Sequence, residues 1–241
     1  MKKSYQTIYE DDQLIIVNKF APFLTIPDRF NSDKVNLYNL LKAKYGEIFI
    51  VHRLDMETSG VICFAKMAEA HQNLSRQFQD RTTTKIYQAI VRGKVAEESG
   101  QIEAPIAAHL HIAGKMTTHK KGKPSLTHYK VLERFQRYSL VELDLKTGRT
   151  HQIRVHLKSI GHPLAVDKMY ANNEAFFLSE IKKRSYKTGK YEEERPLMNR
   201  LTLHACRLSI QHPKTQEKLI FEAPLPKDFR AMLQQLRKWG K

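Results

Sequence analysis

The chain has 241 residues, of which 41 are Lys or Arg and 25 are Asp or Glu, so its formal net charge is +16. With 41% hydrophobic and 27% charged residues it has the composition of a folded globular protein, which excludes a disordered tail and a fibrous chain. A charge this positive attracts polyanions, and for a chain of this size we expect the polyanion to be nucleic acid.

Several classes of protein are excluded early. The apolar runs at residues 14–17 and 61–65 are far shorter than the ~20 residues that a membrane helix needs. The N-terminal residues include acids where a signal peptide needs an apolar stretch, and Cys63 and Cys206 lie far apart in apolar segments. We therefore expect a cytoplasmic protein with no membrane contact and no disulfide framework. The sequence has no metal-binding spacing and no glycine-rich phosphate loop, so we expect neither a metal nor a cofactor.

Hydrophobic periodicity predicts strands and helices along the whole chain. Apolar residues alternate with polar ones in the strand predicted at 141–145, and they recur every three or four residues in the helix predicted at 67–79. The predicted strands cover residues 7–9, 14–19, 48–51, 61–65, 86–91, 101–106, 126–135, 141–145, 201–210 and 219–222. The predicted helices cover residues 35–45, 67–79, 150–160 and 228–239.

The order of these elements predicts the fold class. Many strands with interspersed helices favour an α+β fold with a largely antiparallel sheet. Ser32 or Asp33 is expected to cap the first helix, and Thr150 the third. Because the chain has no internal repeat and no linker, we expect a single domain over residues 1–241.

Two polar stretches lie beside strands and carry charges that a core would not tolerate. The first, HRLDMETSG at 52–60, places Asp55 between two apolar strands. An Asp followed by Thr-Ser-Gly is also typical of a turn that hydrogen-bonds its own backbone. The second, GRTHQIRVHL at 148–157, is a strand-to-helix junction whose basic residues are also typical of a helix face that touches phosphate.

Four segments of the chain resemble, in order, the motifs of the RluA family of RNA pseudouridine synthases: HRLDMETSG, KIYQAIVRG, TGRTHQIRVHL followed by GHPL, and LHACRL. The resemblance runs from about Tyr9 to Pro226. It implies isomerisation of uridine to pseudouridine in structured ribosomal or transfer RNA, without a metal or organic cofactor. It also implies a mixed, mainly antiparallel sheet with flanking helices around a central RNA-binding cleft, in agreement with the predicted strands.

The resemblance also implies which residues carry the reaction. Asp55, the Asp of HRLD, is implied to be the catalytic carboxylate, together with Tyr87 of the K-x-Y motif and Arg154, the second Arg of GRTHQIRVH. Arg53 matches the residue that helps displace the target base, and Leu203 matches an apolar position that packs near the uracil. The neighbouring motif residues that we expect to bind substrate are His52, Arg149, His151 and Gln152.

The chemistry of the reaction suits these residue types. It must break the bond between a uracil nitrogen and ribose, rotate the base and rejoin it through carbon 5. An ionised carboxylate can attack the anomeric carbon or the ring, or remove a sugar proton to give a glycal, and the sequence leaves all three routes open. A guanidinium keeps a buried Asp ionised, a Tyr ring covers one face of uracil, and the target must leave its stack to be reached.

The chain departs from the family pattern in three places. Val166 and Ala171 stand where relatives usually have glycine in HPLxGDxxYG. Too few residues precede Tyr9 for the N-terminal RNA-binding domain that many relatives carry, so we expect only the catalytic domain. The segment from about Ala171 to Pro196 is longer than in compact relatives. Its charged core, IKKRSYKTGKYEEER, is expected on the surface, either as a spacer or as a contact to RNA.

The main alternative is a non-catalytic RNA-binding or assembly factor derived from a synthase, which the charge would suit equally well. That alternative predicts erosion of the catalytic positions, whereas Asp55, Tyr87 and Arg154 are all present. A metal-dependent nuclease would need clustered carboxylates, and the acids here are scattered. We therefore expect a monomeric isomerase with RNA as its partner, and no protein partner is implied.

Overall fold

A computed structural model of the chain describes residues 4–28, 31, 33–182 and 193–241. Contacts between residues divide the chain into two compact units. The first comprises Met1–Tyr87 and His204–Pro224, and the second comprises Gln88–Leu203 and Leu225–Lys241. The chain therefore crosses from one unit to the other after Tyr87, after Leu203 and after Pro224. The single domain over residues 1–241 stays a prediction.

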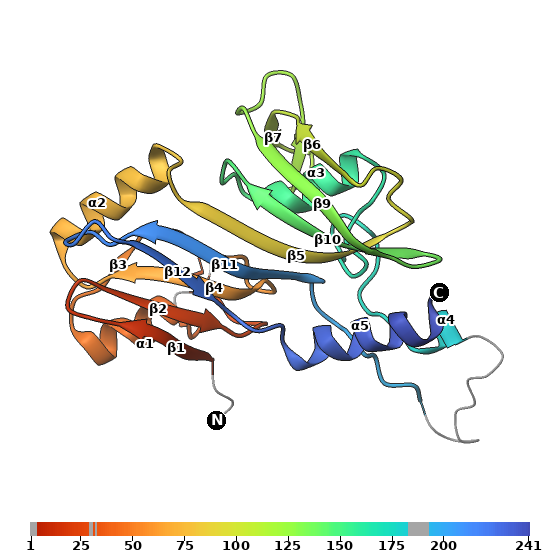
Figure 1. The fold of residues 1–241 in the computed structure, drawn as a ribbon, viewed down its shortest axis with the longest axis horizontal. Helices are drawn as coiled ribbons and strands as arrows, with labels where there is room; N and C mark the ends of the chain where they lie inside the picture. Colours follow the sequence, from red (N-terminus) through yellow and green to blue (C-terminus); the bar gives the residue numbers. More distant parts are fainter. Residues whose placement is uncertain (1–3, 29–30, 32, 183–192) are drawn as a thin grey trace. The chain divides into compact units, whose positions relative to one another are not determined.

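The first unit is built on a sheet in which neighbouring strands follow the order β1-β2-β4-β11, with β3 paired to β4 and β12 paired to β11 (Figure 1). The pairs β1–β2, β2–β4, β3–β4 and β11–β12 are antiparallel, whereas β4 and β11 run parallel. The strands are β1 (Tyr5–Glu10), β2 (Leu14–Lys19), β3 (Phe49–Ile50), β4 (Ser59–Ala65), β11 (Leu203–Gln211) and β12 (Lys218–Glu222).

The helices α1 (Leu37–Tyr45) and α2 (Ala68–Gln79) belong to the first unit. Ala70 and Leu74 lie four residues apart and so share one face of α2, and both are buried in the cluster that contains Cys63 of β4. A fully buried Leu stabilises a fold by about 1.5 to 3 kcal/mol, so this face holds α2 on the sheet.

The second unit has the strand order β5-β10-β9-β6 and a separate pair, β7–β8. The pairs β9–β10, β6–β9 and β7–β8 are antiparallel. Its strands are β5 (Thr84–Arg92, begun in the first unit), β6 (Ser99–Glu103), β7 (Ile106–Ala108), β8 (Met116–Thr118), β9 (Leu126–Arg134) and β10 (Tyr138–Leu145). Its helices are α3 (Gln152–Ser159), α4 (Ser179–Lys182) and α5 (Lys227–Trp239). Both units combine strands with helices, so the predicted α+β class with a mixed, mainly antiparallel sheet is confirmed.

Apolar residues of the segment at 171–196 contribute to the core of the second unit, and one of them, Ile181, begins the charged core that we expected on the surface. Phe176 is fully buried and Ile181 of α4 is 9% exposed, and both pack in a cluster with Phe229 of α5. The backbone of Phe176 also pairs with that of Met198. The segment is thus anchored by its apolar residues. Residues 183–192, which make up most of the charged core, lie outside the described residues.

Two helices begin at residues other than those predicted. The side chain of Asn36, rather than of Ser32 or Asp33, caps α1 by accepting a hydrogen bond from a first-turn N–H at 2.9 Å. Ser32 itself lies outside the described residues. Helix α3 begins after His151, which has a left-handed φ of 54°, so Thr150 is not its cap. A positive φ is uncommon for a residue other than glycine, and at His151 it marks a sharp junction between the turn and the helix.

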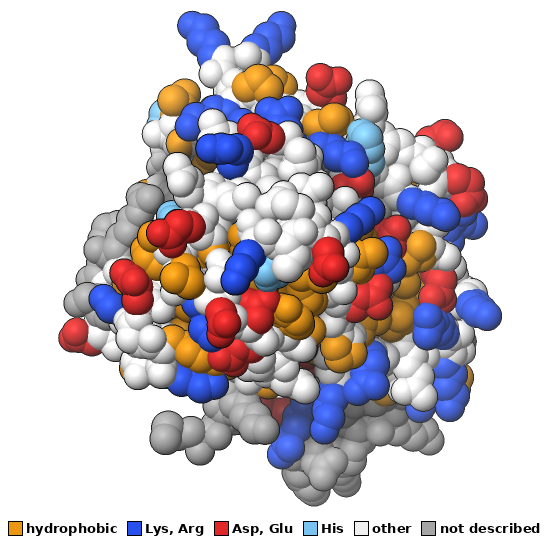
Figure 2. All heavy atoms as spheres, turned by 60° about the vertical axis from the view of Figure 1, so that its left-hand side comes forward, with side chains coloured by type: hydrophobic (Ala, Val, Ile, Leu, Met, Phe, Trp, Pro, Cys, Tyr) orange, Lys and Arg blue, Asp and Glu red, His pale blue; other side chains and the backbone are white. Residues whose placement is uncertain are grey.

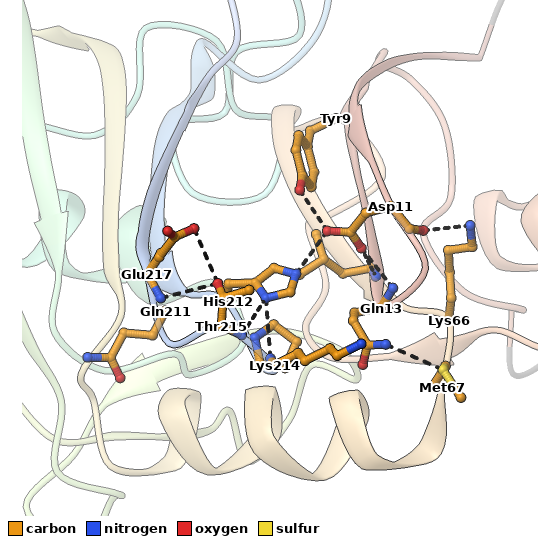
Figure 3. Close-up of polar contacts among 12 residues, drawn as sticks. Tyr9, Asp11, Gln13, Lys66, Met67, Gln211, His212, Lys214, Thr215 and Glu217 are labelled. Carbon is orange, nitrogen blue, oxygen red and sulfur yellow. Dashed lines mark hydrogen bonds and ion pairs between the residues drawn. The ribbon is translucent and has the colours of Figure 1, made fainter.

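The turns of two hairpins in the first unit are joined by a polar network (Figure 3). His212, directly after β11, places Nε2 2.9 Å from Oδ2 of Asp11 in the β1–β2 turn, and the Tyr9 hydroxyl donates to the same oxygen at 2.7 Å. Because Nδ1 of His212 accepts the N–H of Thr215, Nε2 carries the proton and donates to Asp11. Burial opposes ionisation of Asp11, but these hydrogen bonds outweigh it and lower the pKa of the carboxyl.

Candidate active site

Asp55 lies in the loop that connects β3 with β4. Its carbonyl oxygen accepts the N–H of Thr58 at 3.1 Å, so the chain turns at this residue. The flanking Leu54 is buried, whereas Asp55 is half-buried and Arg53 is exposed. The turn interpretation of this motif and the catalytic one are therefore compatible, because the turn uses the backbone of Asp55 and not its carboxylate.

The backbone on both sides of Asp55 is held by side chains from β2 and the loop that follows it. Lys19, at the end of β2, is fully buried and donates from Nζ to the carbonyl oxygen of Met56 at 3.1 Å and to a second carbonyl at 2.7 Å. The Thr25 hydroxyl donates to the carbonyl oxygen of Leu54 at 2.7 Å. Sequence reasoning missed Lys19, although a lysine at the end of the apolar run LIIVNK was a signal.

Tyr87 lies on β5 in the first unit and is 7% exposed. Burial first, and then the negative charge of Asp55, raise the pKa of its hydroxyl above the ordinary value. The two side chains are therefore close enough to interact electrostatically within this unit. At neutral pH Tyr87 is a neutral phenol that can donate a hydrogen bond and present a flat ring.

His52 is held by contacts inside the first unit. His52 lies just after the two-residue strand β3. Its Nε2 accepts the backbone N–H of Cys63 at 3.1 Å. Its ring stacks on Phe78 with centroids 4.6 Å apart and planes 22° from parallel. Burial first, and then the positive charge of Lys85, lower the pKa of His52 to about 3, so the ring is neutral. These contacts explain the residue through packing, and its contact with substrate stays a prediction.

The loop ends where β4 and β11 approach closely. Gly60 has a φ of 123°, and a Cβ on it would lie 2.1 Å from the carbonyl oxygen of Ala205, so only glycine fits. Beside this contact, Oγ of Ser59 lies 2.9 Å from Nδ1 of His204. The HRLDMETSG segment and His204–Leu208 of the LHACRL segment are thus neighbours in the first unit. Leu203, which begins β11, is 4% exposed, and its contact with uracil stays a prediction.

Arg154, on α3 in the second unit, forms a buried fork with Asp167. Its Nε and Nη2 donate to the two carboxylate oxygens at 2.7 and 2.9 Å, and the two side chains are 7% and 1% exposed. The guanidinium carbon also lies 4.8 Å from the ring centroid of Tyr170. This fork joins GRTHQIRVH to the segment that follows GHPL. A fork between Arg154 and the catalytic carboxylate stays a prediction.

Gln152 is buried at the start of α3, and its amide is fully used inside the second unit. Its oxygen accepts from the Thr147 hydroxyl at 2.8 Å and from the Arg149 N–H at 3.0 Å. Its nitrogen donates to the carbonyl of Leu126 and the hydroxyl of Thr127, both at 3.0 Å. All four bonding positions are filled, so a contact with substrate would have to displace one of them.

Arg149 and His151 keep partly exposed side chains. Nε of Arg149 donates to the carbonyl of Pro124 at 3.4 Å, and Nδ1 of His151 lies 2.9 Å from the Tyr170 hydroxyl. Their contacts with RNA stay predictions. Val166, which stands at a glycine position of the family pattern, is 2% exposed and packs in the core of the second unit. This position therefore serves packing.

Residues 13–159 match the family model described as RNA pseudouridylate synthase. The chain belongs to the RNA pseudouridylate synthase family. It is therefore an isomerase that acts on RNA, as the motifs implied.

Curated members of the synthase family match nearly the whole chain. It is 38% identical to ribosomal large subunit pseudouridine synthase D of Blochmanniella floridana, covering 96% of this chain and 73% of that protein. It is 42% identical to the protein of the same name in Neisseria meningitidis serogroup B, covering 95% of this chain and 60% of that protein. The uncharacterized RNA pseudouridine synthase YlyB of Bacillus subtilis is 37% identical, with 96% and 73% covered. The chain thus spans roughly two thirds of the length of these relatives.

Solved structures of synthase-family proteins share the fold. Human RNA pseudouridylate synthase domain containing 4 aligns with a TM-score of 0.74 at 25% identity, covering 96% of this chain and 92% of that one. Human RNA pseudouridylate synthase domain containing 1 aligns with a TM-score of 0.71 at 27% identity, covering 97% and 94%. The fold class expected from the motifs is therefore confirmed.

Charged side chains of both signs lie on the face of this synthase that Figure 2 draws. On the face drawn in Figure 2, Lys and Arg side chains lie among Asp and Glu, so the excess positive charge is not gathered into one patch there. Within residues 4–28, 31, 33–182 and 193–241, no three or more His, Cys, Asp or Glu residues are grouped so that they could hold a metal ion. The helices in these ranges are all too short or too polar to cross a membrane.

Proposed function

We propose that this chain converts uridine to pseudouridine in large-subunit ribosomal RNA, with Asp55 as the catalytic carboxylate. The family match over residues 13–159 carries the proposal, and Asp55 and Tyr87 support it, since they lie in one unit where burial and then the Asp55 charge raise the pKa of the phenol. The names of the curated relatives support ribosomal RNA as the substrate, and transfer RNA is the other class that the motifs allow.

Asp55 supplies the charge that the bond exchange needs. The carboxylate attacks the anomeric carbon or the ring, or removes a sugar proton, and each route requires it to be ionised and well oriented. The hydrogen bonds from Lys19 and Thr25 to the neighbouring carbonyls hold the loop in one conformation before substrate arrives. A preformed geometry of this kind lowers the barrier, because less ordering is left for the reacting state.

Tyr87 covers one face of the uracil and donates a hydrogen bond from its neutral hydroxyl. A phenol with a raised pKa is a poor base at neutral pH, so the proton lost from carbon 5 leaves to another acceptor. Arg53, exposed beside Asp55, fills the space that the flipped base vacates and contacts phosphate. Leu203 packs near the uracil.

Arg154 stays a proposed catalytic residue, and its fork with Asp167 fixes the orientation of its guanidinium. A bidentate guanidinium loses little freedom when it meets substrate, because both of its prongs are already ordered. Arg149 and His151 contact RNA phosphates from their partly exposed positions. His52 and Gln152 shape the two motifs through their interior hydrogen bonds.

The remaining proposals concern assembly and location. We propose that the chain acts as a monomer in the cytoplasm. Its two cysteines lie apart in apolar strands, which suits a reducing compartment. Sedimentation of the chain with and without RNA measures its oligomeric state.

The test of the function combines mapping with a variant. Pseudouridines are mapped by carbodiimide-primer extension in RNA from cells with and without the gene, and turnover is measured as tritium release from carbon-5-labelled RNA. Asp55→Asn should abolish turnover and bind RNA as the parent does, because an amide cannot do carboxylate chemistry and phosphate contacts lie elsewhere. Asp12→Asn, an exposed acid of the first unit, is the matched control.

The outcomes separate the hypotheses. Turnover of Asp55→Asn within tenfold of the parent removes Asp55 from the chemistry. Binding of RNA by the parent without any pseudouridine favours the non-catalytic assembly factor. Pseudouridine found only in transfer RNA would support the proposed reaction and replace ribosomal RNA with transfer RNA as the substrate.

A further inference from the structure

A buried lysine, a phenylalanine and a histidine are stacked beside the loop that carries Asp55. Nζ of Lys85 lies 5.6 Å from the ring centroid of Phe78, and the same ring stacks on His52 at 4.6 Å. All these residues belong to the first unit. The stack therefore connects β5, α2 and the start of the loop through one aromatic ring.

Lys85 is unusual because of its position and burial. It is 8% exposed on β5, and it stands two residues before Tyr87, so the two side chains leave the strand on the same face. Burying an ammonium costs several kcal/mol before any partner compensates, and a well-packed apolar side chain of similar length is often as stable or more stable. The free energy of folding alone does not explain a lysine at this position, so we expect a functional role for its ammonium.

We propose that Lys85 is a positioning residue for the catalytic loop, acting through Phe78 on His52. The ammonium is attracted to the face of the Phe78 ring, and this contact fixes the ring against the imidazole. The imidazole in turn holds the N–H of Cys63 in β4 at 3.1 Å. The entrance of the loop is thereby tied to the sheet three residues before Asp55. This inference rests on the proposed function of Asp55.

The charge of Lys85 also keeps His52 in the form that this bond needs. Nε2 can accept the N–H of Cys63 only while it is unprotonated. Burial, assisted by the positive charge of Lys85, favours that neutral form. An imidazole that gained a proton would turn an N–H toward the N–H of Cys63, and the tie would be lost.

The first experiment compares stability with the chemical step. Lys85→Met removes the cation and keeps an apolar side chain of similar length, and its unfolding temperature is measured beside its rate. Its single-turnover rate at saturating enzyme should fall by about tenfold or more, since displacements near 1 Å at a reacting group cost up to about 100-fold. The Michaelis constant should stay within about threefold. Lys85→Arg should recover most of the rate because it keeps a cation over the ring.

A matched control and a double-mutant cycle test the path. Lys218→Met changes an exposed lysine on β12 of the same unit and should leave the single-turnover rate unchanged. Phe78→Leu should lower the rate as Lys85→Met does, and the double variant should be no slower than either single one. Additive losses would mean that Lys85 acts by another path, which overturns the proposal.

Hydrogen exchange gives a readout that does not need turnover. The Cys63 amide should lose protection in Lys85→Met, while the amides of β2 keep theirs. Parental protection of Cys63 in this variant overturns the proposal, and so does a loss of rate that comes with a lower unfolding temperature and no rescue by Lys85→Arg. If the parent modifies no RNA, the proposed function fails, and the Cys63 exchange still decides whether Lys85 holds His52.

Discussion

Two ionisable residues near Asp55, His52 and Tyr87, are held in their neutral forms by burial. His52 stays an imidazole because its Nε2 must accept the Cys63 N–H, and Tyr87 stays a phenol because both burial and the Asp55 charge oppose the phenolate. The charge that the reaction needs is therefore left to the carboxylate, and the neighbours contribute shape and hydrogen bonds.

The neutral His52 predicts a loss of stability in acid. Its pKa falls from 6.5 to about 3 on folding, so below pH 6.5 the unfolded chain binds a proton that the folded chain does not. This contribution to stability is complete above pH 6.5 and is lost as the pH falls toward 3. In His52→Gln the amide oxygen can accept the same N–H without titrating. Urea unfolding from pH 8 to 4 should show a shallower decline for His52→Gln than for the parent, and parallel curves would contradict the assignment.

We expect that the hydroxyl of Tyr87 adds no tyrosinate absorbance in an alkaline titration up to pH 10. Because its pKa lies above the ordinary value of 10.0, Tyr87 should remain protonated at pH 10 in the folded chain, where an exposed tyrosine is half ionised. The tyrosinate absorbance near 295 nm should therefore be the same for the parent and Tyr87→Phe up to that pH. A larger signal from the parent would show that the hydroxyl ionises freely.

Hairpin turns in the first unit are stabilised by a side chain from a distant strand. Asp11 receives hydrogen bonds from Tyr9, from its own turn and from His212, so it joins the β1–β2 turn to the end of β11. Asp12, its neighbour, is exposed. The contrast offers a test in which two adjacent acids of one turn have different roles.

Asp11→Ala should lower the free energy of unfolding by about 2 kcal/mol, because buried donors lose their acceptor. Asp12→Ala should change it by less than about 0.5 kcal/mol, as expected for a surface position. Urea titrations at pH 7 measure both. Because folding lowers the pKa of Asp11, its contribution is present above the unfolded pKa near 3.8 and is lost as the pH falls through the folded value. Equal effects of the two substitutions would contradict a specific role for Asp11.

Elements with a strong local pattern could be predicted from the sequence, and those shaped by distant contacts could not. The apolar run of β4 and the amphipathic face of α2 are local and agree with the structure. The start of α3 is not local, because His151 takes a left-handed conformation beside the Tyr170 hydroxyl. Thr150 had the right chemistry for a cap but lies one residue too early.

In the candidate site too, features set by a local motif could be predicted, and those set by distant contacts could not. Asp55 and Tyr87 lie in recognisable motifs, and both belong to the first unit, where the Asp55 charge helps to raise the pKa of Tyr87 after burial. The fork of Arg154 with Asp167 could not be predicted, because Asp167 is 13 residues away and reaches it only through the fold of the intervening loop. Lys19 was missed because its carbonyl partners come from separate segments.

At the scale of the whole molecule, the charge of +16 predicts RNA binding that depends on salt. Each phosphate that a Lys or Arg neutralises releases counterions, so the logarithm of the affinity should fall linearly with the logarithm of the salt concentration, by about 0.7 to 0.9 per contact. Filter binding between 50 and 200 mM salt measures the slope. Arg149→Gln should reduce it by about one contact. A flat dependence would show that the charge is not an RNA footprint.

The route of the chain between the two units has a consequence for synthesis on the ribosome. The parallel partner of β4 is β11, and His204 is added about 140 residues after Ala65. At 5 to 20 residues per second this interval lasts roughly 7 to 30 s, during which Ser59 and Gly60 at the start of β4 lack the neighbour that β11 later supplies. The nascent chain must therefore carry an incomplete N-terminal sheet while the second unit is being made. Chaperone demand during translation should follow the spacing of these two strands more closely than the final stability of the protein.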